Sequence, residues 1–169
     1  IDLADILRWC IGQAQSTADD RSVAIDTQLH GATVVGIEDQ LKMLFANVLS
    51  NAIVYSHEGG NVRVHCEAGN GNGPTVIFED NGIGIAEKKV PRIFDEYYRT
   101  DEAARHNKES TGLGLTIVHH VASTHKIRVR VESVLGKGTK FTLNFPPTEQ
   151  FQDTDDSGKE KGNGISADS

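Results

Sequence analysis

The sequence is poor in cysteine, in aromatic residues and in long apolar runs. Its 169 residues include two cysteines, Cys10 and Cys66, with no CxxC spacing. This excludes a disulfide-rich secreted domain and indicates core cysteines in a reducing, cytosol-like compartment. The longest mostly apolar stretch, residues 43–55, is interrupted by polar side chains and is shorter than the roughly 20 residues of a membrane span. We therefore expect a cytoplasmic chain without direct membrane contact.

Basic residues are also in deficit. The chain has 17 Lys and Arg against 24 Asp and Glu, a formal net charge of −7, which disfavours nucleic-acid binding. The length suits one domain around one core. Residues 148–169 contain six acidic and two basic residues and almost no large apolar side chains, so we expect a domain over residues 1–147 and an acidic disordered tail over residues 148–169. The first residue is Ile1, which predicts an excerpt of a longer protein.

Hydrophobic periodicity predicts an α+β fold. Three segments have the spacing of amphipathic helices: residues 2–16, residues 38–56 and a helix that contains Leu115, Val118 and Val121. The alternation of apolar residues predicts strands at residues 22–29, 33–35, 62–66, 75–79, 127–132 and 140–145. Paired strands interleaved with helices favour a two-layer α/β sandwich, in which a mixed sheet of about five or more strands is covered by three helices.

Two asparagines lie on the second predicted helix. Asn47 and Asn51 are four residues apart and therefore lie one turn apart, at the border of the buried stripe. Their amide oxygens are suitable ligands for a hard cation. The alternative is that both are ordinary solvated side chains.

An apolar strand ends at Asp80 and is followed by glycines at alternate positions, Gly82 and Gly84. Glycine allows a ligand to approach the backbone closely. An ionised carboxylate only accepts hydrogen bonds, so Asp80 suits the exocyclic amine of adenine and would repel the carbonyl of guanine. The alternative is a tight Asp-Asn-Gly turn.

A run of small residues, 110–114, opens directly into the third predicted helix. The unpaired N–H groups and the dipole of such a helix end favour phosphate, although glycines before a helix also serve close packing. Residues 92–111 form a long polar segment with cations, including Arg99, Arg105, His106 and Lys108. We interpret it as a mobile lid, or otherwise as a solvated linker.

Four short motifs follow one another along the chain: Asn47-Val-Leu-Ser-Asn51-Ala52, Asp80-Asn-Gly82-Ile-Gly84, Arg92-Ile-Phe94 and Gly112-Leu-Gly114-Leu115. Together they resemble the N, G1, F and G2 boxes of the catalytic ATP-binding domain of bacterial sensor histidine kinases, within the GHKL ATPase superfamily. The resemblance covers residues 1–146, including the closing hairpin Gly136-Lys-Gly138-Thr139-Lys-Phe141. It implies the Bergerat (GHKL) ATP-binding fold.

The resemblance also implies an ATP site between the helices and the sheet, with Asp80 at the adenine amine, Thr139 contacting it through water, and Tyr55 against the base. Asn51 resembles the magnesium-binding asparagine, with Asn47 as a second candidate ligand, and both are expected to be catalytic together with Arg99. The expected ATP-binding residues are Asn47, Asn51, Tyr55, Asp80, Gly82, Gly84, Ile85, Tyr98, Arg99, Thr111, Gly112, Leu113, Gly114, Leu115 and Thr139. The expected cofactors are ATP and Mg²⁺.

By the same resemblance, the chain is expected to transfer the ATP γ-phosphate to a histidine on a separate dimerisation and phosphoacceptor domain, which passes it to the receiver domain of a response regulator. The expected location of the chain is cytoplasmic. Its parent protein can be anchored in the inner membrane by sensing segments.

Asn47 stands where gyrase-like and Hsp90-like relatives carry a water-activating glutamate, and an amide is no general base. Slow hydrolysis is therefore expected.

Three departures from the family pattern keep two other functions open. Val54 stands where many members have a lysine, and Ser110 stands where the G2 box often begins with glycine. A phosphoacceptor segment is missing, because Ser56-His57-Glu58 continues as Gly59-Gly60. The alternatives are a degenerate nucleotide-sensing module and an anti-sigma-type serine kinase, although the latter resemble the family without an F box.

The last predicted helix carries or precedes three histidines, His119, His120 and His125. Their spacing matches no HExxH-type metal site, so we expect them to be structural or exposed.

Overall fold

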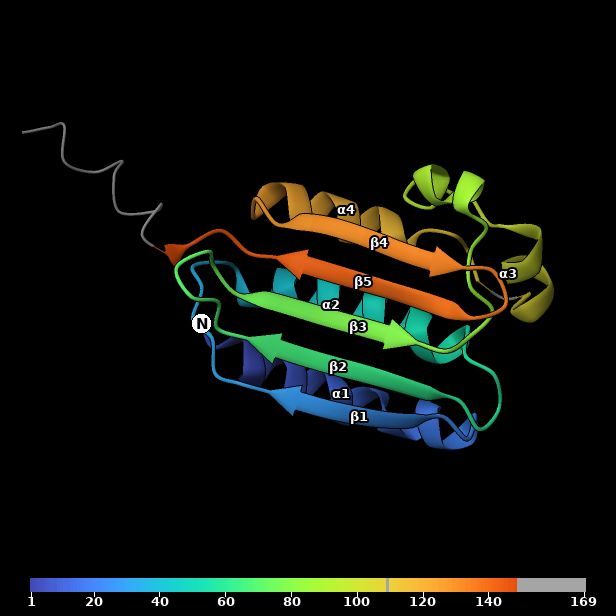
Figure 1. The fold of residues 1–169 in the computed structure, drawn as a ribbon, viewed down its shortest axis with the longest axis horizontal. Helices are drawn as coiled ribbons and strands as arrows, with labels where there is room; N and C mark the ends of the chain where they lie inside the picture. The colour runs from blue at the N-terminus through green and yellow to red at the C-terminus, as the bar shows by residue number, and fades with distance from the viewer. Residues whose placement is uncertain (109, 149–169) are drawn as a thin grey trace, which may run out of the picture.

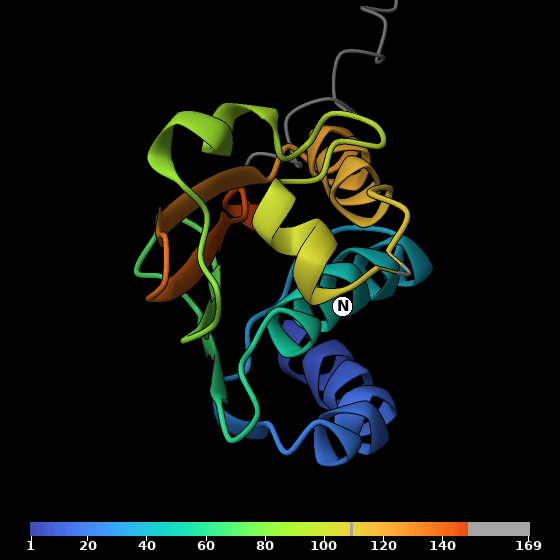
Figure 2. The same ribbon diagram turned by 90° about the vertical axis from the view of Figure 1, so that its right-hand side faces the viewer.

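The computed structural model describes residues 1–108 and 110–148. One five-stranded sheet is covered on one face by three long helices, so the chain forms two layers (Figures 1 and 2). This confirms the predicted α+β sandwich. Within the described ranges no helix combines the length and hydropathy needed to cross a membrane. The predicted tail, apart from Thr148, lies outside the described residues.

The three long helices are α1 (Leu3–Asp20), α2 (Glu38–Val54) and α4 (Gly114–Thr124). Asp2 caps the N-terminus of α1, because its carboxylate accepts a hydrogen bond from the Ala4 backbone N–H at 2.7 Å, and the helix extends one turn beyond its predicted end. Helix α2 packs against both of the other helices. Its predicted apolar stripe is buried, with Leu41, Leu44, Phe45, Val48 and Ala52 in the core. Helix α2 is therefore packed between α1 and α4 and against strands β2 (Asn61–Glu67) and β3 (Thr75–Asp80) of the sheet.

The sheet has the order β1-β2-β3-β5-β4. Its strands are β1 (Ala24–Leu29), β2 (Asn61–Glu67), β3 (Thr75–Asp80), β4 (Arg128–Val134) and β5 (Gly138–Asn144). The β1–β2 pair is parallel and the other pairs are antiparallel, so the sheet is mixed. In the register of β3 and β5, Asp80 lies opposite Thr139. The last residue of β3 therefore lies beside the start of β5.

The predicted strand at residues 33–35 is wrong. Thr33 forms only an isolated antiparallel bridge with Asp2. The chain leaves the sheet after β1 and runs beside the N-terminus, where the Leu3 N–H donates to the Ala32 carbonyl and the Val34 N–H donates to the Ile1 carbonyl, both at 2.9 Å. The Ile1 amino group also donates to the Val34 carbonyl at 2.9 Å. These three bonds pair residues 32–34 with the start of the chain over too short a length for a strand.

Both cysteines, Cys10 and Cys66, are buried and unpaired, as expected for core residues. Burial raises the pKa of each thiol to about 11. Their thiols therefore stay protonated at neutral pH.

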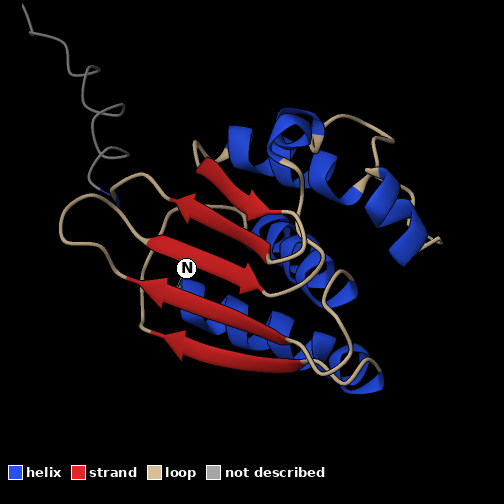
Figure 3. Ribbon diagram, turned by 45° about the vertical axis from the view of Figure 1, so that its right-hand side comes forward, coloured by secondary structure: helices blue, strands red, loops and turns tan. Residues whose placement is uncertain are grey.

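The segment between β3 and α4 contains two short helices, η1 (Glu87–Arg92) and α3 (Asp101–His106) (Figure 3). The Thr100 hydroxyl accepts a hydrogen bond from the Ala103 N–H at 3.0 Å and caps the start of α3. Helix α3 lies at the end of the sheet where β3 and β4 terminate (Figure 1). The lid predicted from composition therefore carries a helix of its own.

Candidate nucleotide-binding site

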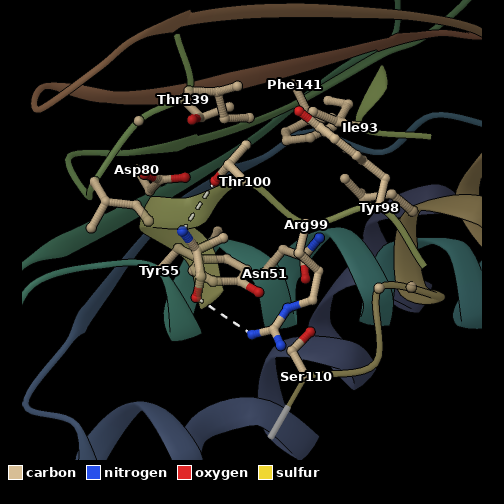
Figure 4. Close-up of a pocket in the computed structure, with 18 residues that line it drawn as sticks. Asn51, Tyr55, Asp80, Ile93, Tyr98, Arg99, Thr100, Ser110, Thr139 and Phe141 are labelled. Carbon is tan, nitrogen blue, oxygen red and sulfur yellow. Dashed lines mark hydrogen bonds between the residues drawn. The ribbon is translucent and has the colours of Figure 1, made fainter. Parts of the chain in front are cut away.

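A cavity opens between the helix layer and the end of the sheet that α3 covers. Figure 4 shows Asp80 and Thr139 on its sheet side and Asn51 and Tyr55 on its helix side. The residues that line it are Asn51, Ala52, Tyr55, Asp80, Ile83, Gly84, Ile85, Ile93, Tyr98, Arg99, Thr100, Ala103, Ser110, Gly112, Gly114, Leu115, Thr139 and Phe141. Apolar walls with a few convergent polar groups are typical of a small-molecule site.

Asp80 supplies the carboxylate of this cavity. Its Oδ1 accepts a hydrogen bond from the Gly82 N–H at 2.9 Å, and the Thr139 backbone N–H also donates to the carboxylate. Burial outweighs these bonds and raises the pKa of Asp80 to about 6. Above that pH the side chain is an ionised acceptor in a poorly hydrated setting, which suits a ligand that brings hydrogen-bond donors.

The glycines after Asp80 allow a close approach of backbone to backbone. A Cβ at Gly82 would lie 2.0 Å from the Tyr55 carbonyl oxygen, and a Cβ at Gly84 would lie 2.0 Å from the Val134 carbonyl oxygen. Gly84 also has a φ of +67°, which favours glycine. The loop is therefore pressed between the end of α2 and the β4–β5 turn, and this fixes the position of the Asp80 carboxylate.

Asn47 and Asn51 both face the start of α4. The Asn47 Nδ2 donates to the Met43 carbonyl at 2.8 Å. A Cβ at Gly114 would lie 2.9 Å from the Asn47 Oδ1 and 4.0 Å from the Asn51 Oδ1. The two amide oxygens thus converge on the first residue of α4, where no side chain caps the helix and no acidic residue stands in the first turn. Neutral oxygens beside a helix N-terminus that lacks a side-chain cap suit a metal-bound phosphate.

The lid segment partly fills the cavity. Thr100 and Ala103 enter its lining, and the remaining volume is about 100 Å³, below the roughly 300–1,000 Å³ typical of small-molecule sites. The Arg99 guanidinium donates to the carbonyls of Asn107 and Ala103, and the His106 ring contacts the Val54 carbonyl at 2.8 Å. The start of α3 therefore occupies part of the space at the mouth of the cavity.

Most of the predicted site residues meet in the cavity, but four do not line it. Asn47 contacts Gly114 outside the cavity lining, and Gly82 contributes only its backbone N–H, which donates to the Asp80 side chain. Thr111 and Leu113 belong to the glycine-rich turn that leads into α4, outside the cavity lining.

Several lining residues were not predicted as site residues: Ala52, Ile83, Ile93, Thr100, Ala103, Ser110 and Phe141. Two of them had a signal in the sequence. Phe141 is two residues after Thr139 on a strand and so points to the same face, and the Thr-Asp-Glu start of residues 100–102 is a helix N-cap pattern.

The histidines at the end of α4 are structural or exposed, as predicted. His125 is buried, its Nδ1 lies 3.0 Å from the Val121 carbonyl, and its Nε2 accepts a hydrogen bond from the Ile37 N–H at 3.1 Å. His119 and His120 are exposed.

Residues 36–149 match the family described as histidine kinase-, DNA gyrase B- and HSP90-like ATPase. The chain belongs to this family. Membership implies ATP binding. In this chain Asp80, the glycine loop that follows it (residues 81–85) and the start of α4 all contribute to the lining of one cavity.

Curated relatives of the chain are sensor histidine kinases. The chain is 34% identical to the phosphate regulon sensor protein PhoR of Pseudomonas aeruginosa over 81% of its own length and 30% of that protein. It is 36% identical to the sensor-like histidine kinase SenX3 of Mycolicibacterium smegmatis, over 86% of the chain and 38% of that protein. The chain thus spans about a third of the length of these relatives.

Solved structures share the fold. The mycobacterial sensor histidine kinase MprB superimposes with a TM-score of 0.79 at 23% identity, covering 87% of the chain and 97% of that structure. The catalytic domain of histidine kinase ThkA gives a TM-score of 0.74 at 20% identity, covering 89% of the chain and 95% of that structure.

Proposed function

We propose that the chain is the catalytic ATP-binding domain of a sensor histidine kinase and transfers the γ-phosphate of Mg-ATP to a histidine on a separate phosphoacceptor and dimerisation domain. That domain would then pass the phosphoryl group to the receiver domain of a response regulator. The observation that carries this proposal is the convergence of Asp80, Asn51 and the start of α4 on one cavity, with the Asn47 amide oxygen next to Gly114 at that helix start. Sensor histidine kinase relatives at 34–36% identity support it.

In this proposal each side of the cavity takes one part of the nucleotide. Asp80 would accept from the adenine amine, Thr139 would contact the amine through a water, and Tyr55 would pack against the base. Gly84, Ile85, Tyr98, Gly112, Gly114, Leu115 and Arg99 would line the nucleotide, with Gly82, Thr111 and Leu113 shaping the loops behind them. The full-length kinase ShkA, which shares this fold at 24% identity, is described in complex with AMPPNP.

The amide oxygens of Asn51 and Asn47 would hold Mg²⁺ together with phosphate oxygens and water. The donor set fits this ion, because amide oxygens are hard ligands and Mg²⁺ is commonly held by few protein groups plus substrate phosphates. No group of three or more His, Cys, Asp or Glu side chains suited to a metal occurs among the described residues. Bound Mg²⁺ supplies neutralisation of phosphate charge.

The residues around the phosphates favour transfer over hydrolysis. Asn47 carries an amide and so provides no general base for water. The N–H groups of α4 would orient the phosphates, and Arg99 would neutralise charge once it leaves the carbonyls of α3. Positioning and electrostatics therefore dominate, and the acceptor is an imidazole that the chain itself does not supply.

A phosphotransfer assay tests this proposal. The full chain is incubated with Mg-ATP labelled in the γ-phosphate and with a purified acceptor domain, and with an acceptor whose histidine is replaced by glutamine. The expected product is an acid-labile, base-stable phosphoramidate on the intact acceptor alone. Acid-stable phosphoserine would instead support a serine kinase, and ATP binding without transfer would support a nucleotide-sensing module.

A further inference from the structure

Ser133 breaks the apolar pattern of the face of β4 that points toward the helices. Along this strand Val129, Val131 and Ser133 are partly buried, while the residues between them are exposed. A hydroxyl therefore takes the third inward position. It does not line the cavity, but it lies directly behind Thr139, which does and which is only 8% exposed.

The Ser133 hydroxyl makes three hydrogen bonds at once. The Ile85 N–H donates to its Oγ at 2.8 Å. Its own proton is donated to the Gly138 carbonyl at 2.9 Å. The Thr139 Oγ1 lies 2.8 Å away. Serine offers one donor and two acceptor positions, so these three partners saturate it.

Counting protons fixes the direction of the contact with Thr139. The Gly138 carbonyl only accepts, so at 2.9 Å it requires the single Ser133 proton. The third contact must then use the Thr139 proton, with Thr139 as donor and Ser133 as acceptor. The opposite direction would leave two acceptor oxygens facing each other without a proton. The Thr139 hydroxyl thus turns its proton away from the cavity and presents lone pairs to it.

The acceptor character of Thr139 matches that of its neighbour. Asp80 lies opposite Thr139 in the sheet register and its carboxylate lines the same part of the cavity. A free threonine hydroxyl can donate as well as accept, so on its own Thr139 would tolerate a carbonyl on the ligand. Because its proton is donated to Ser133, the Thr139 hydroxyl can only accept hydrogen bonds from a ligand.

We propose that Ser133 is a positioning residue that sets base selectivity: by engaging the Thr139 proton, it makes the sheet side of the cavity accept a 6-amino purine and reject a 6-oxo purine. This inference rests on the proposed nucleotide site. It goes beyond the role of Asp80, because it assigns part of the selectivity to a residue that touches no ligand.

Ser133 also has a structural role, because it anchors the Ile85 N–H of the glycine loop. Loss of this anchor alone would weaken all nucleotides equally. The informative quantity is therefore the ratio of the dissociation constants of inosine diphosphate and adenosine diphosphate, whose bases differ in the 6-oxo and 6-amino groups. A structural effect leaves this ratio unchanged.

Calorimetric titration of the full chain with both diphosphates tests the inference. For Ser133→Ala we expect the ratio to fall about five- to tenfold, chiefly through tighter inosine diphosphate binding, because the freed Thr139 hydroxyl can donate to the bridging water, which then has a proton for the 6-oxo group. Ser133→Cys fills the same space with a weak hydrogen-bonding group and should lower the ratio in the same direction. Ser133→Thr, which keeps the hydroxyl, should restore it.

Two further variants separate the explanations. Thr75→Ala removes a strand hydroxyl that bonds Asn144 at 3.2 Å, remote from the cavity, and should leave the ratio unchanged. In a Thr139→Val background, Ser133→Ala should have no further effect on the ratio. An unchanged ratio in both Ser133→Ala and Ser133→Cys, with a selective wild-type protein, would overturn the inference alone. A wild-type protein that binds neither diphosphate would overturn the proposed function as well.

Discussion

Replacement of Asp80 by asparagine should weaken nucleotide binding and stabilise the empty protein. Asp80→Asn keeps the shape of the side chain and one oxygen that can accept from the Gly82 and Thr139 N–H groups, but it exchanges the second oxygen for an NH₂ donor. An adenine amine then faces a donor. The lost bond to a charged acceptor contributes about 1.5–3 kcal/mol, so the affinity for an adenine nucleotide should fall roughly 10- to 100-fold.

The stability effect follows from the buried charge. Burial raises the pKa of Asp80 from its usual 3.8 to about 6. The native protein therefore binds more protons than the unfolded chain between about pH 4 and pH 6, and the contribution of this group to stability is present below that window and lost as the pH rises through it. At pH 7.5 the loss amounts to as much as about 3 kcal/mol, and the neutral asparagine avoids it.

Urea unfolding at pH 7.5 and pH 4 and calorimetric titration with adenosine diphosphate measure the two effects. We expect Asp80→Asn to raise the free energy of unfolding at pH 7.5 and to match the wild type near pH 4. Glu132→Gln is the matched control, because that carboxylate is 48% exposed and pairs with Arg130 at 3.0 Å, so it should change neither quantity by more than about 0.5 kcal/mol. Unchanged affinity, or a destabilised variant at pH 7.5, would refute the reasoning.

Three other predictions, one of them with a control substitution, test separate parts of the structure. Asn51→Ala should weaken the magnesium-dependent part of nucleotide affinity about tenfold, or about 1.4 kcal/mol, in titrations with and without Mg²⁺; an unchanged magnesium dependence would remove the metal assignment. Gly84→Ala should destabilise the fold by more than about 2 kcal/mol in urea unfolding, because its Cβ would meet the backbone at 2.0 Å, whereas Gly12→Ala, with nothing within 4 Å in a helix, should stabilise it by up to about 1 kcal/mol. His125→Ala should reduce the free energy of unfolding by about 1–3 kcal/mol, because it leaves the Ile37 N–H without its acceptor; a wild-type value would show that this bond contributes nothing.

The long helices and central strands were predictable because each carries its period locally. The stripe from Leu41 to Ala52 identified α2, and the same period placed Asn47 and Asn51 one turn apart at its border. The order of the motifs was sufficient to place Asp80 and Gly114 in one site. The helices and strands depend on neighbours within a few residues of each other, whereas the placement of Asp80 and Gly114 in one site depended on the resemblance of the ordered motifs to a known family.

The features that were not predicted depend on contacts between distant segments. The bridge at Thr33 depends on the chain passing Asp2, which no local pattern shows. Helix α3 is only six residues long, so its position over the cavity depends on contacts such as that of His106 with the Val54 carbonyl. The role of Ser133 required the positions of three hydrogen-bond partners, which alternation along β4 does not reveal.

The central claim is that the cavity at the end of β3 binds an adenine nucleotide with Mg²⁺. Calorimetric titration of the full chain with a nonhydrolysable ATP analogue, with and without Mg²⁺, and with the corresponding GTP analogue as control, tests it most directly. The structure predicts one site per chain, tighter binding with Mg²⁺ and a clear preference for adenine, all weakened by Asp80→Asn. Absence of binding, or equal binding of the GTP analogue, would contradict it.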